Sequence, residues 1–333
     1  MPATATAPNS AVAFAPASVG NAAVGFDLLG HAIDGPGDSV VATRRRCPGV
    51  AIERIDGVVT DLPLEPENNT AGRAVLALLA ARQPDLGVTL TIHKGIGLGS
   101  GLGGSAASAT AALVAANALL DRPLPQADLY PFALAGESLA SGAAHGDNVG
   151  PQLLGGLVLA TPDRLVAIPV PDGLWAVVVH PDHIVETRHA RASLAAPFPI
   201  ETIVAQQTNL ARVLCGCYTG DRELIKSGLA DVLVEPRRAP LVPGFAEVKQ
   251  AALDHGALGA SISGAGPSVF GWFERREQAE VAGSAMRSAF ANQGLDARVH
   301  ASPVDAPGAR LIDAPMLQST GQSNRPADSC QNR

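Results

Sequence analysis

The chain has 333 residues, of which 47% are apolar, 17% charged and 4% aromatic. This apolar share supports a hydrophobic core and excludes global disorder, and a net charge of −7 gives no basic surface for a polyphosphate backbone, so nucleic-acid binding is excluded as the main role. Four cysteines at irregular positions are too few for a disulfide framework and favour a reducing cytoplasm.

The N-terminal residues show no basic segment followed by an apolar one, so no signal peptide is expected and a cytoplasmic location follows. Between Lys94 and Asp121 the sequence has no charged residue, a stretch long enough to span a bilayer. Glycines interrupt its first half and alanines fill its second half, so no membrane span is expected.

Strands and helices are both predicted in the first 160 residues. Alternating apolar positions are typical of strands, and Asn69 before an apolar run is typical of a helix start. The pattern predicts strands around residues 12–14, 24–33, 38–43, 88–93 and 157–159, and helices over 70–79, 105–120 and 126–139. The opening 60 residues therefore form a β-rich unit.

The second half groups its strands and helices. The pattern predicts strands over residues 166–168, 176–179 and 297–301 and on both sides of 263–266, and helices over 187–232, 245–255 and 277–292. Grouping of this kind is typical of the α+β class. After Pro315 almost no apolar residue occurs, so residues 316–333 are expected to form a disordered tail.

A glycine-rich turn occupies residues 95–104, between a predicted strand and a predicted helix. Six of its ten residues are glycine. A backbone without Cβ atoms can approach an anion closely, and the amides and dipole at a helix N-terminus attract negative charge. The turn is therefore predicted to bind phosphate.

Other phosphate loops match this turn poorly. A Walker A loop needs a lysine, which Gly103-Gly104-Ser105 lacks, and the protein-kinase motifs His-Arg-Asp and Asp-Phe-Gly are absent from the sequence. A dinucleotide fingerprint matches formally at residues 99–104, but its acidic partner, Asp121, follows a predicted helix instead of a strand. A nucleotide-dependent dehydrogenase stays a weak alternative.

The turn resembles the loop of the GHMP kinase superfamily, Pro-x-x-x-Gly-Leu-Gly-Ser-Ser-Ala followed by a helix. Gly97 stands where that loop has proline, and Gly104 replaces the first of its two serines. The resemblance implies ATP as cofactor, with Ser105 facing magnesium and the β- and γ-phosphates, and Asn68 near the adenine. The implied nucleotide-binding residues are Asn68, Gly97, Leu98, Gly99, Ser100, Gly101, Leu102, Gly103, Gly104, Ser105, Ala106 and Ala107.

Further blocks resemble those of homoserine kinases. Residues 15–30 match the first signature of that family without gaps, and Asn21 and Asp27 are its only strongly polar side chains. By themselves such residues are most often a turn asparagine and a capping aspartate. The resemblance places both at an amino-acid substrate, with Asp27 accepting hydrogen bonds from its ammonium group.

Glu137 and the segment from His145 to Asn148 form the second block. Taken alone, Glu137 is most often a solvated helix residue and His145 a loop histidine. The eight-residue spacing between them resembles that in homoserine kinases, which implies that Glu137 and Ser105 hold Mg2+. Asn148 would then face the substrate hydroxyl without accepting its proton, so catalysis is expected to rely on positioning. His145 or Asp147 stays an alternative proton acceptor.

The third block is C-terminal and contains arginines. Exposed arginines are usually solvated, but a small amino acid needs its carboxylate held, and guanidinium groups do this bidentately. The resemblance implies that Arg191 and Arg238 hold the carboxylate with Thr187 nearby, and a shift by one residue to Arg188 or Arg237 stays open. Residues 262–268 resemble a third glycine motif that supports the phosphate loop.

The resemblance covers residues 11 to about 312 and implies a two-part architecture: a ribosomal-protein-S5-like α/β half over residues 1–160, a ferredoxin-like half over 161–315, and the tail. The implied reaction is phosphorylation of the L-homoserine hydroxyl by ATP in threonine biosynthesis, with Mg2+. The alternative in the same superfamily is a mevalonate- or sugar-type kinase. The expected partners are these small molecules, without nucleic acid or membrane, in a homodimer.

Overall fold

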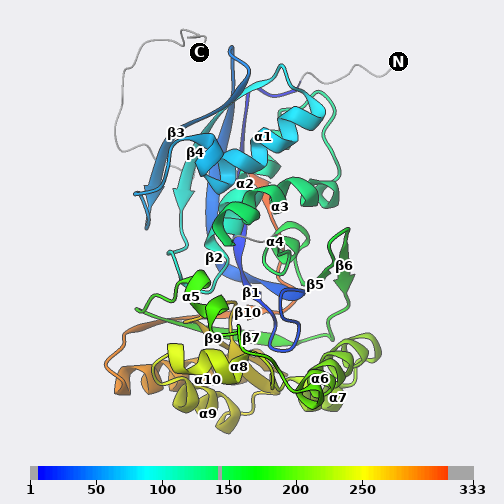
Figure 1. The fold of residues 1–333 in the computed structure, drawn as a ribbon, viewed down its shortest axis with the longest axis vertical. Coiled ribbons are helices and arrows are strands. Elements are labelled where there is room, and N and C mark those ends of the chain that lie inside the picture. Colours follow the sequence, from blue (N-terminus) through cyan, green and yellow to red (C-terminus); the bar gives the residue numbers. More distant parts are fainter. Residues whose placement is uncertain (1–6, 142–144, 314–333) are drawn as a thin grey trace.

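The computed structural model describes residues 7–141 and 145–313. Two β-sheets lie one beyond the other along the long axis of the molecule, each covered by its own helices (Figure 1). The predicted α+β class and two-part architecture are confirmed, and the predicted tail of residues 316–333 lies outside the described residues.

The first sheet has seven strands in the order β11-β1-β2-β4-β3, with β5 paired to β2 and β6 paired to β5. All neighbours are antiparallel except β3 and β4. The strands are β1 (Ser10–Gly20), β2 (Leu29–Arg45), β3 (Gly49–Gly57), β4 (Gly87–Lys94), β5 (Leu157–Ala160), β6 (Leu165–Ile168) and β11 (Arg310–Ile312).

Helices cover this sheet, and the glycine-rich turn connects the end of β4 to one of them. They are η1 (Pro66–Asn68), α1 (Thr70–Arg82), α2 (Gly104–Ala118), η2 (Gln126–Leu129), α3 (Tyr130–Ser141) and α4 (Val149–Leu154). Helix α2 follows the turn directly, packs on β1 and β2, and is buried from Ala106 to Ala116. The alanines of the charge-free stretch thus fit a helix inside a protein core, and the described residues contain no helix long and apolar enough to cross a membrane.

The second sheet has four antiparallel strands in the order β10-β7-β9-β8. Helices α9 and α10 pack against it and against each other, which gives the β-α-β-β-α-β arrangement of a ferredoxin-like half. The strands are β7 (Trp175–Pro181), β8 (Gly259–Ile262), β9 (Val269–Phe273) and β10 (Ala297–Pro303). The helices are α5 (Thr187–Ala192), α6 (Ile200–Thr219), α7 (Arg222–Gly228), α8 (Glu235–Arg238), η3 (Ala239–Leu241), α9 (Phe245–Asp254) and α10 (Arg276–Asn292).

The two halves share a hydrophobic core. On β9, Val269 and Phe273 pack toward the helices, whereas Phe270 and Trp272 join the core of the first half. The fully buried His31 of β2 accepts a hydrogen bond from Trp272 Nε1 at 3.1 Å. Burial lowers the pKa of His31 to about 4, so this histidine is neutral at physiological pH.

Some sequence-based expectations are wrong in detail. Residues 24–33 do not form one strand, because the chain turns at 21–28 before β2 begins. The predicted helical stretch 187–232 is divided into α5, α6 and α7 by prolines and glycines, and β3 and β11 are not predicted at all. Cys47 is disulfide-bonded, which the cysteine spacing does not predict, while Cys215 and Cys217 are free.

Candidate active site

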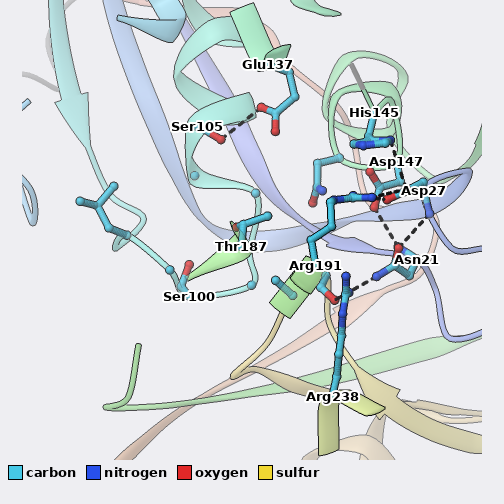
Figure 2. A pocket seen from close by; sticks show the side chains of 18 of the residues that line it. Asn21, Asp27, Ser100, Ser105, Glu137, His145, Asp147, Thr187, Arg191 and Arg238 are labelled. Carbon is cyan, nitrogen blue, oxygen red and sulfur yellow. Dashed lines mark hydrogen bonds and ion pairs between the residues drawn. The ribbon is translucent and has the colours of Figure 1, made fainter. Parts of the chain in front are cut away.

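A cavity of about 230 Å³ opens at the N-terminus of α2, between the two halves of the molecule. Its wall combines the glycine-rich turn with polar side chains from both halves (Figure 2). The predicted residues that line it are Asn21, Asp27, Gly97, Leu98, Gly99, Ser100, Gly101, Gly103, Gly104, Ser105, Glu137, His145, Asn148, Thr187, Arg191 and Arg238.

The conformation of the turn requires glycine at alternate positions. Gly99, Gly101 and Gly103 all have positive φ, between 58° and 76°. A Cβ on Gly101 would stand 2.5 Å from the carbonyl oxygen of Ser263, so the turn is pressed against the segment that resembles the third glycine motif. The sequence thus encodes a close backbone approach here.

The carbonyl groups of the turn are directed into the protein. From residue 99 to residue 102 each carbonyl oxygen accepts a hydrogen bond at 2.6–3.2 Å. The donors, in order, are the Val185 amide, the Ser268 hydroxyl, the Ser263 hydroxyl and the Ser18 amide. Within the described part of the chain, the amides of Gly103, Gly104 and Ser105 have no acceptor, and no side chain caps α2. These amides are therefore available to an anion.

Ser105 and Glu137 meet at the side of the cavity nearest α3. The Ser105 hydroxyl donates to Glu137 Oε2 at 3.1 Å. Glu137 is 9% exposed, and burial raises the pKa of its carboxyl to about 8. A carboxyl group held in so dry a place is stabilised as an anion when a cation arrives, and carboxylate and hydroxyl oxygens are ligands of the kind that Mg2+ uses. The predicted pair thus has suitable donor chemistry.

Asn21 connects the two halves at the floor of the site. Its backbone has a φ of 67°, unusual for a residue other than glycine, and its side chain is fixed at both ends. Asn21 Oδ1 accepts the Asp27 amide at 3.0 Å and Nδ2 donates to the Gly264 carbonyl at 2.9 Å. Its amide donates to Asp147 Oδ2, and burial with the nearby Asp27 raises the pKa of Asp147 to about 7. Asn21 therefore shapes the turn at residues 21–28.

Asp27 is surrounded by cationic or titratable partners. Arg191 donates to both carboxylate oxygens, at 2.9 and 3.1 Å, and His145 Nδ1 lies 3.2 Å from Oδ2. Burial lowers the pKa of His145. Arg191 and Arg238 both lie over the ring of Phe26, at 5.4 and 5.1 Å. The two arginines thus converge on one place from different helices.

Three polar atoms in this place are buried without a hydrogen-bond partner among the described residues: Nε of Arg191, Nε of Arg238 and Nε2 of His145. Arg238 is 3% exposed and bonds the Gly264 carbonyl at 2.8 Å through Nη1. Buried polar groups are normally satisfied, so the two unpaired arginine N–H donors in the cavity wall are suited to a ligand with acceptor oxygens.

Neighbouring arginines have other contacts. Arg237 donates to the carbonyls of Leu194, Ala196 and Pro197 and stacks on Phe198, and Arg188 is exposed. Neither lines the cavity, so the alternative of a shift by one residue is not supported. Asn68 is exposed in η1, and Leu102, Ala106 and Ala107 are buried behind the turn; these four also lie outside the cavity wall.

Asn148 stands at the start of α4 beside the phosphate turn. Its Oδ1 accepts the Ser18 hydroxyl at 2.9 Å and would stand 2.7 Å from a Cβ on Gly103. Sequence reasoning also missed the buried pair Lys94 and Asp38, which lies beneath the turn and outside the cavity wall. Lys94 stands at the start of the long charge-free stretch, but nothing near it in the sequence indicates its pairing with Asp38.

Comparisons with known proteins agree with this geometry. Residues 69–156 match the family model of the GHMP kinases N-terminal domain and residues 211–292 that of the GHMP kinases C-terminal domain. The chain therefore belongs to the GHMP kinases, and it is a kinase. Strand β4, which leads into the phosphate turn, pairs antiparallel with β2, whereas the sheet of a dinucleotide-binding fold is mostly parallel. The dehydrogenase alternative is therefore not supported.

Within that superfamily the chain belongs to the homoserine kinase family. It is 58% identical over 300 residues to homoserine kinase of Xanthomonas campestris pv. campestris, covering 90% of this chain and 93% of that one. It is 54% identical to homoserine kinase of Xylella fastidiosa, and that match covers 93% of this chain and 96% of that one. The solved structure of homoserine kinase from Cytophaga hutchinsonii has a TM-score of 0.88 at 42% identity, covering 92% and 98%. Mevalonate kinase of L. major shares only the fold: it is 16% identical with a TM-score of 0.64, and the match covers 88% of this chain and 96% of that one.

Proposed function

We propose that the protein transfers the γ-phosphoryl group of ATP to the hydroxyl of L-homoserine, giving O-phospho-L-homoserine in threonine biosynthesis. The observation that carries the acceptor assignment is the group of Asp27, Arg191 and Arg238 in one cavity wall with the phosphate turn. The names of the relatives support the same acceptor.

An amino-acid zwitterion complements these three side chains. Its ammonium group suits the Asp27 carboxylate, and its carboxylate suits the unpaired Nε donors of Arg191 and Arg238. Asp27 and Arg191 neutralise each other through two hydrogen bonds, and a zwitterion offers each of them a partner of the same charge as the one it would give up. A sugar or another uncharged alcohol would leave charges unmatched.

The turn would hold the transferred phosphate. The free amides at the start of α2 and the helix dipole stabilise charge on the phosphoryl oxygens. Asn148, beside Gly103, has no basic atom, so the acceptor hydroxyl would be oriented without a dedicated base. A loose phosphoryl-transfer transition state requires little early deprotonation, which makes positioning sufficient. His145 and Asp147 stay the alternative proton acceptors.

Mg2+ would be held by Ser105 and Glu137, whose oxygens already lie 3.1 Å apart. When bound, the cation would neutralise charge on the nucleotide oxygens. One carboxylate and one hydroxyl leave most of its positions to water and phosphate, as Mg2+ prefers.

The experiment is a coupled ADP-release assay with L-homoserine, mevalonate, galactose and shikimate, each with and without Mg2+. Of these acceptors, only homoserine is expected to be turned over, and only when Mg2+ is present. Two modified acceptors make the test more specific: homoserine amide lacks the carboxylate and N-acetylhomoserine lacks the ammonium group, so both should be turned over poorly. Turnover of mevalonate or galactose at a rate equal to that of homoserine would refute the acceptor assignment. We also expect a cytoplasmic location and a homodimer. Size-exclusion chromatography with light scattering can check the dimer by its molar mass.

A further inference from the structure

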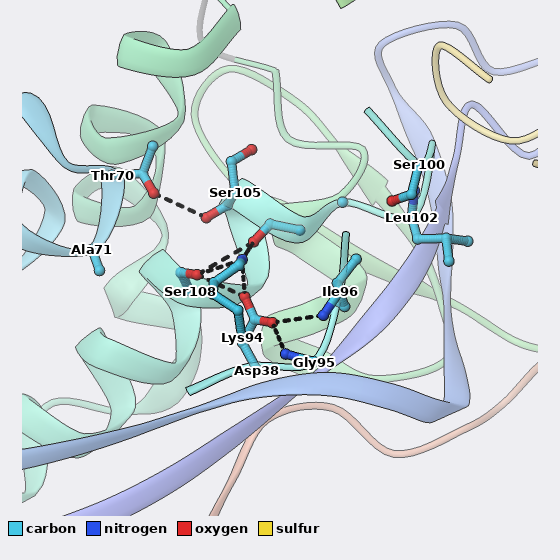
Figure 3. Close-up of polar contacts among 12 residues, drawn as sticks. Asp38, Thr70, Ala71, Lys94, Gly95, Ile96, Ser100, Leu102, Ser105 and Ser108 are labelled. Carbon is cyan, nitrogen blue, oxygen red and sulfur yellow. Dashed lines mark hydrogen bonds and ion pairs between the residues drawn. The ribbon is translucent and has the colours of Figure 1, made fainter. Parts of the chain in front are cut away.

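A buried ion pair lies beneath the phosphate turn, outside the cavity already described. Lys94, the last residue of β4, pairs with Asp38 of β2, and the two residues are 1% and 0% exposed (Figure 3). A buried charge pair is costly to desolvate and is weak evidence of stability by itself. Its place at the start of the turn suggests that its role is to fix that turn.

Every proton of the Lys94 ammonium group is already bonded. Nζ donates to Asp38 Oδ2, to the Gly104 carbonyl at 2.7 Å and to the Ser108 hydroxyl at 2.8 Å. An ammonium group has three donors and no acceptor, so Lys94 has none left for a phosphate oxygen. The lysine next to this phosphate turn is therefore occupied with the protein itself.

Asp38 connects the other end of the turn to the same pair. Its Oδ1 accepts the amides of Gly95 at 2.9 Å and Ile96 at 3.2 Å, and its Oδ2 also accepts the Ser108 hydroxyl at 2.6 Å. The network thus joins the first two residues of the turn to the first turn of α2. In Figure 3 these bonds converge on Asp38 and Lys94 from both sides.

We propose that Lys94 and Asp38 form a loop clamp, a pair of positioning residues that sets the distance between the two ends of the phosphate turn and so aims its free amides at the nucleotide. The inference rests on the proposed use of ATP. Because the clamp touches no residue of the Asp27–Arg191–Arg238 group, it governs nucleotide binding without governing the amino-acid acceptor.

The rival role for Lys94 is direct phosphate binding, and the two roles predict opposite effects of Asp38→Asn. If Lys94 bound phosphate, removing the charge of Asp38 would release the lysine, and nucleotide affinity would be kept or improved. If the pair is a clamp, Asp38→Asn and Lys94→Met damage the same structure. The double variant would then be no worse than the singles, which is the non-additivity of two residues that act as a unit.

The test measures the Kd of a fluorescent ATP analogue, the KM for ATP and the KM for homoserine in Lys94→Met, Asp38→Asn and the double variant. We expect each single variant to raise the nucleotide Kd at least 10-fold and to leave the KM for homoserine within 2-fold. The nucleotide Kd of the double variant should lie within 3-fold of that of the weaker-binding single variant. Asp121→Asn is the matched control, because Asp121 pairs with Arg44 at the surface of the same half with a side chain 71% exposed.

Ser108→Ala keeps the proposal testable if the charge variants do not fold. It removes one hydroxyl from the network and is expected to raise the nucleotide Kd 2- to 5-fold with an unchanged melting temperature. Unchanged or tighter nucleotide binding in Asp38→Asn, or unchanged binding in Ser108→Ala, would overturn the clamp. Since the binding assay needs no acceptor, it reports on the clamp even if homoserine proves not to be the substrate.

Discussion

Replacing Arg238 by leucine tests the acceptor side of the site most directly. Nη1 of Arg238 donates to the Gly264 carbonyl, and Nε has no hydrogen-bond partner among the described residues, so this guanidinium keeps donors for a substrate carboxylate. A hydrogen bond to a charged group contributes about 1.5–3 kcal/mol, which corresponds to a factor of roughly 10 to 150 in binding. We therefore expect the KM for homoserine to rise by about that factor, while the KM for ATP stays within 2-fold.

The neighbouring Arg237 provides the matched control. Arg237→Leu removes the same charge from the same helix, but this side chain bonds main-chain carbonyls and stacks on Phe198 outside the cavity. It is expected to lower the melting temperature without a selective change in the KM for homoserine. Steady-state kinetics with each substrate varied in turn gives both constants. Equal rises in both KM values for Arg238→Leu, or a larger effect of Arg237→Leu on homoserine, would refute the carboxylate role of Arg238.

Three further predictions concern the cation site, the turn and the core. Glu137→Gln resembles the protonated carboxyl and should keep the melting temperature. It cannot become an anion beside a cation, so kcat should fall at least ~100-fold; an unchanged kcat would exclude Glu137 as a metal ligand. Gly101→Ala should abolish nucleotide binding, because its Cβ would meet the Ser263 carbonyl at 2.5 Å. Gly97→Ala should keep the fold, because nothing lies within 4 Å of its Cβ and its φ is not positive. It is expected to raise the free energy of unfolding by about 0.4–1 kcal/mol, measured in urea. His31 binds its proton with a pKa of about 4 when folded and 6.5 when unfolded, so the unfolded chain takes up a proton that the folded one refuses, and stability falls as the pH drops from 6.5 toward 4. The free energy of unfolding is expected to fall by about 3 kcal/mol over this pH range. Urea midpoints for His31→Gln should therefore depend less on pH, and parallel curves for the two proteins would contradict the assignment.

The parts of the site that are local in sequence are predictable from it. The turn at residues 95–104 can be recognised because its alternating positive φ values need glycine, and the homoserine kinase motifs that they match indicate Asn21, Asp27 and Glu137. Asn21, Asp27, Glu137 and seven of the ten residues of the turn line the cavity.

The parts that depend on distant partners are not predictable in this way. Asp38 and Lys94 are 56 residues apart, and neither carries a local sign that it will be buried against the other. Strand β11 has only three residues, two of them exposed, so its own sequence gives no strand pattern. Its existence depends on the edge of β1, which lies some 300 residues earlier in the chain.

Strand β11 has a consequence for the way the protein is made. Val12 pairs with Ile312, so the two ends of the described chain lie side by side, and the sheet of the first half is finished by the last strand of the second. During synthesis from the N-terminus, β1 exposes an unpaired edge until residues 310–312 have left the ribosome, and unpaired edges are where strands from other chains add. The β1 edge therefore stays open to misassembly until β11 can pair with it, and a chain that stops before Arg310 would keep its phosphate turn but lose this strand.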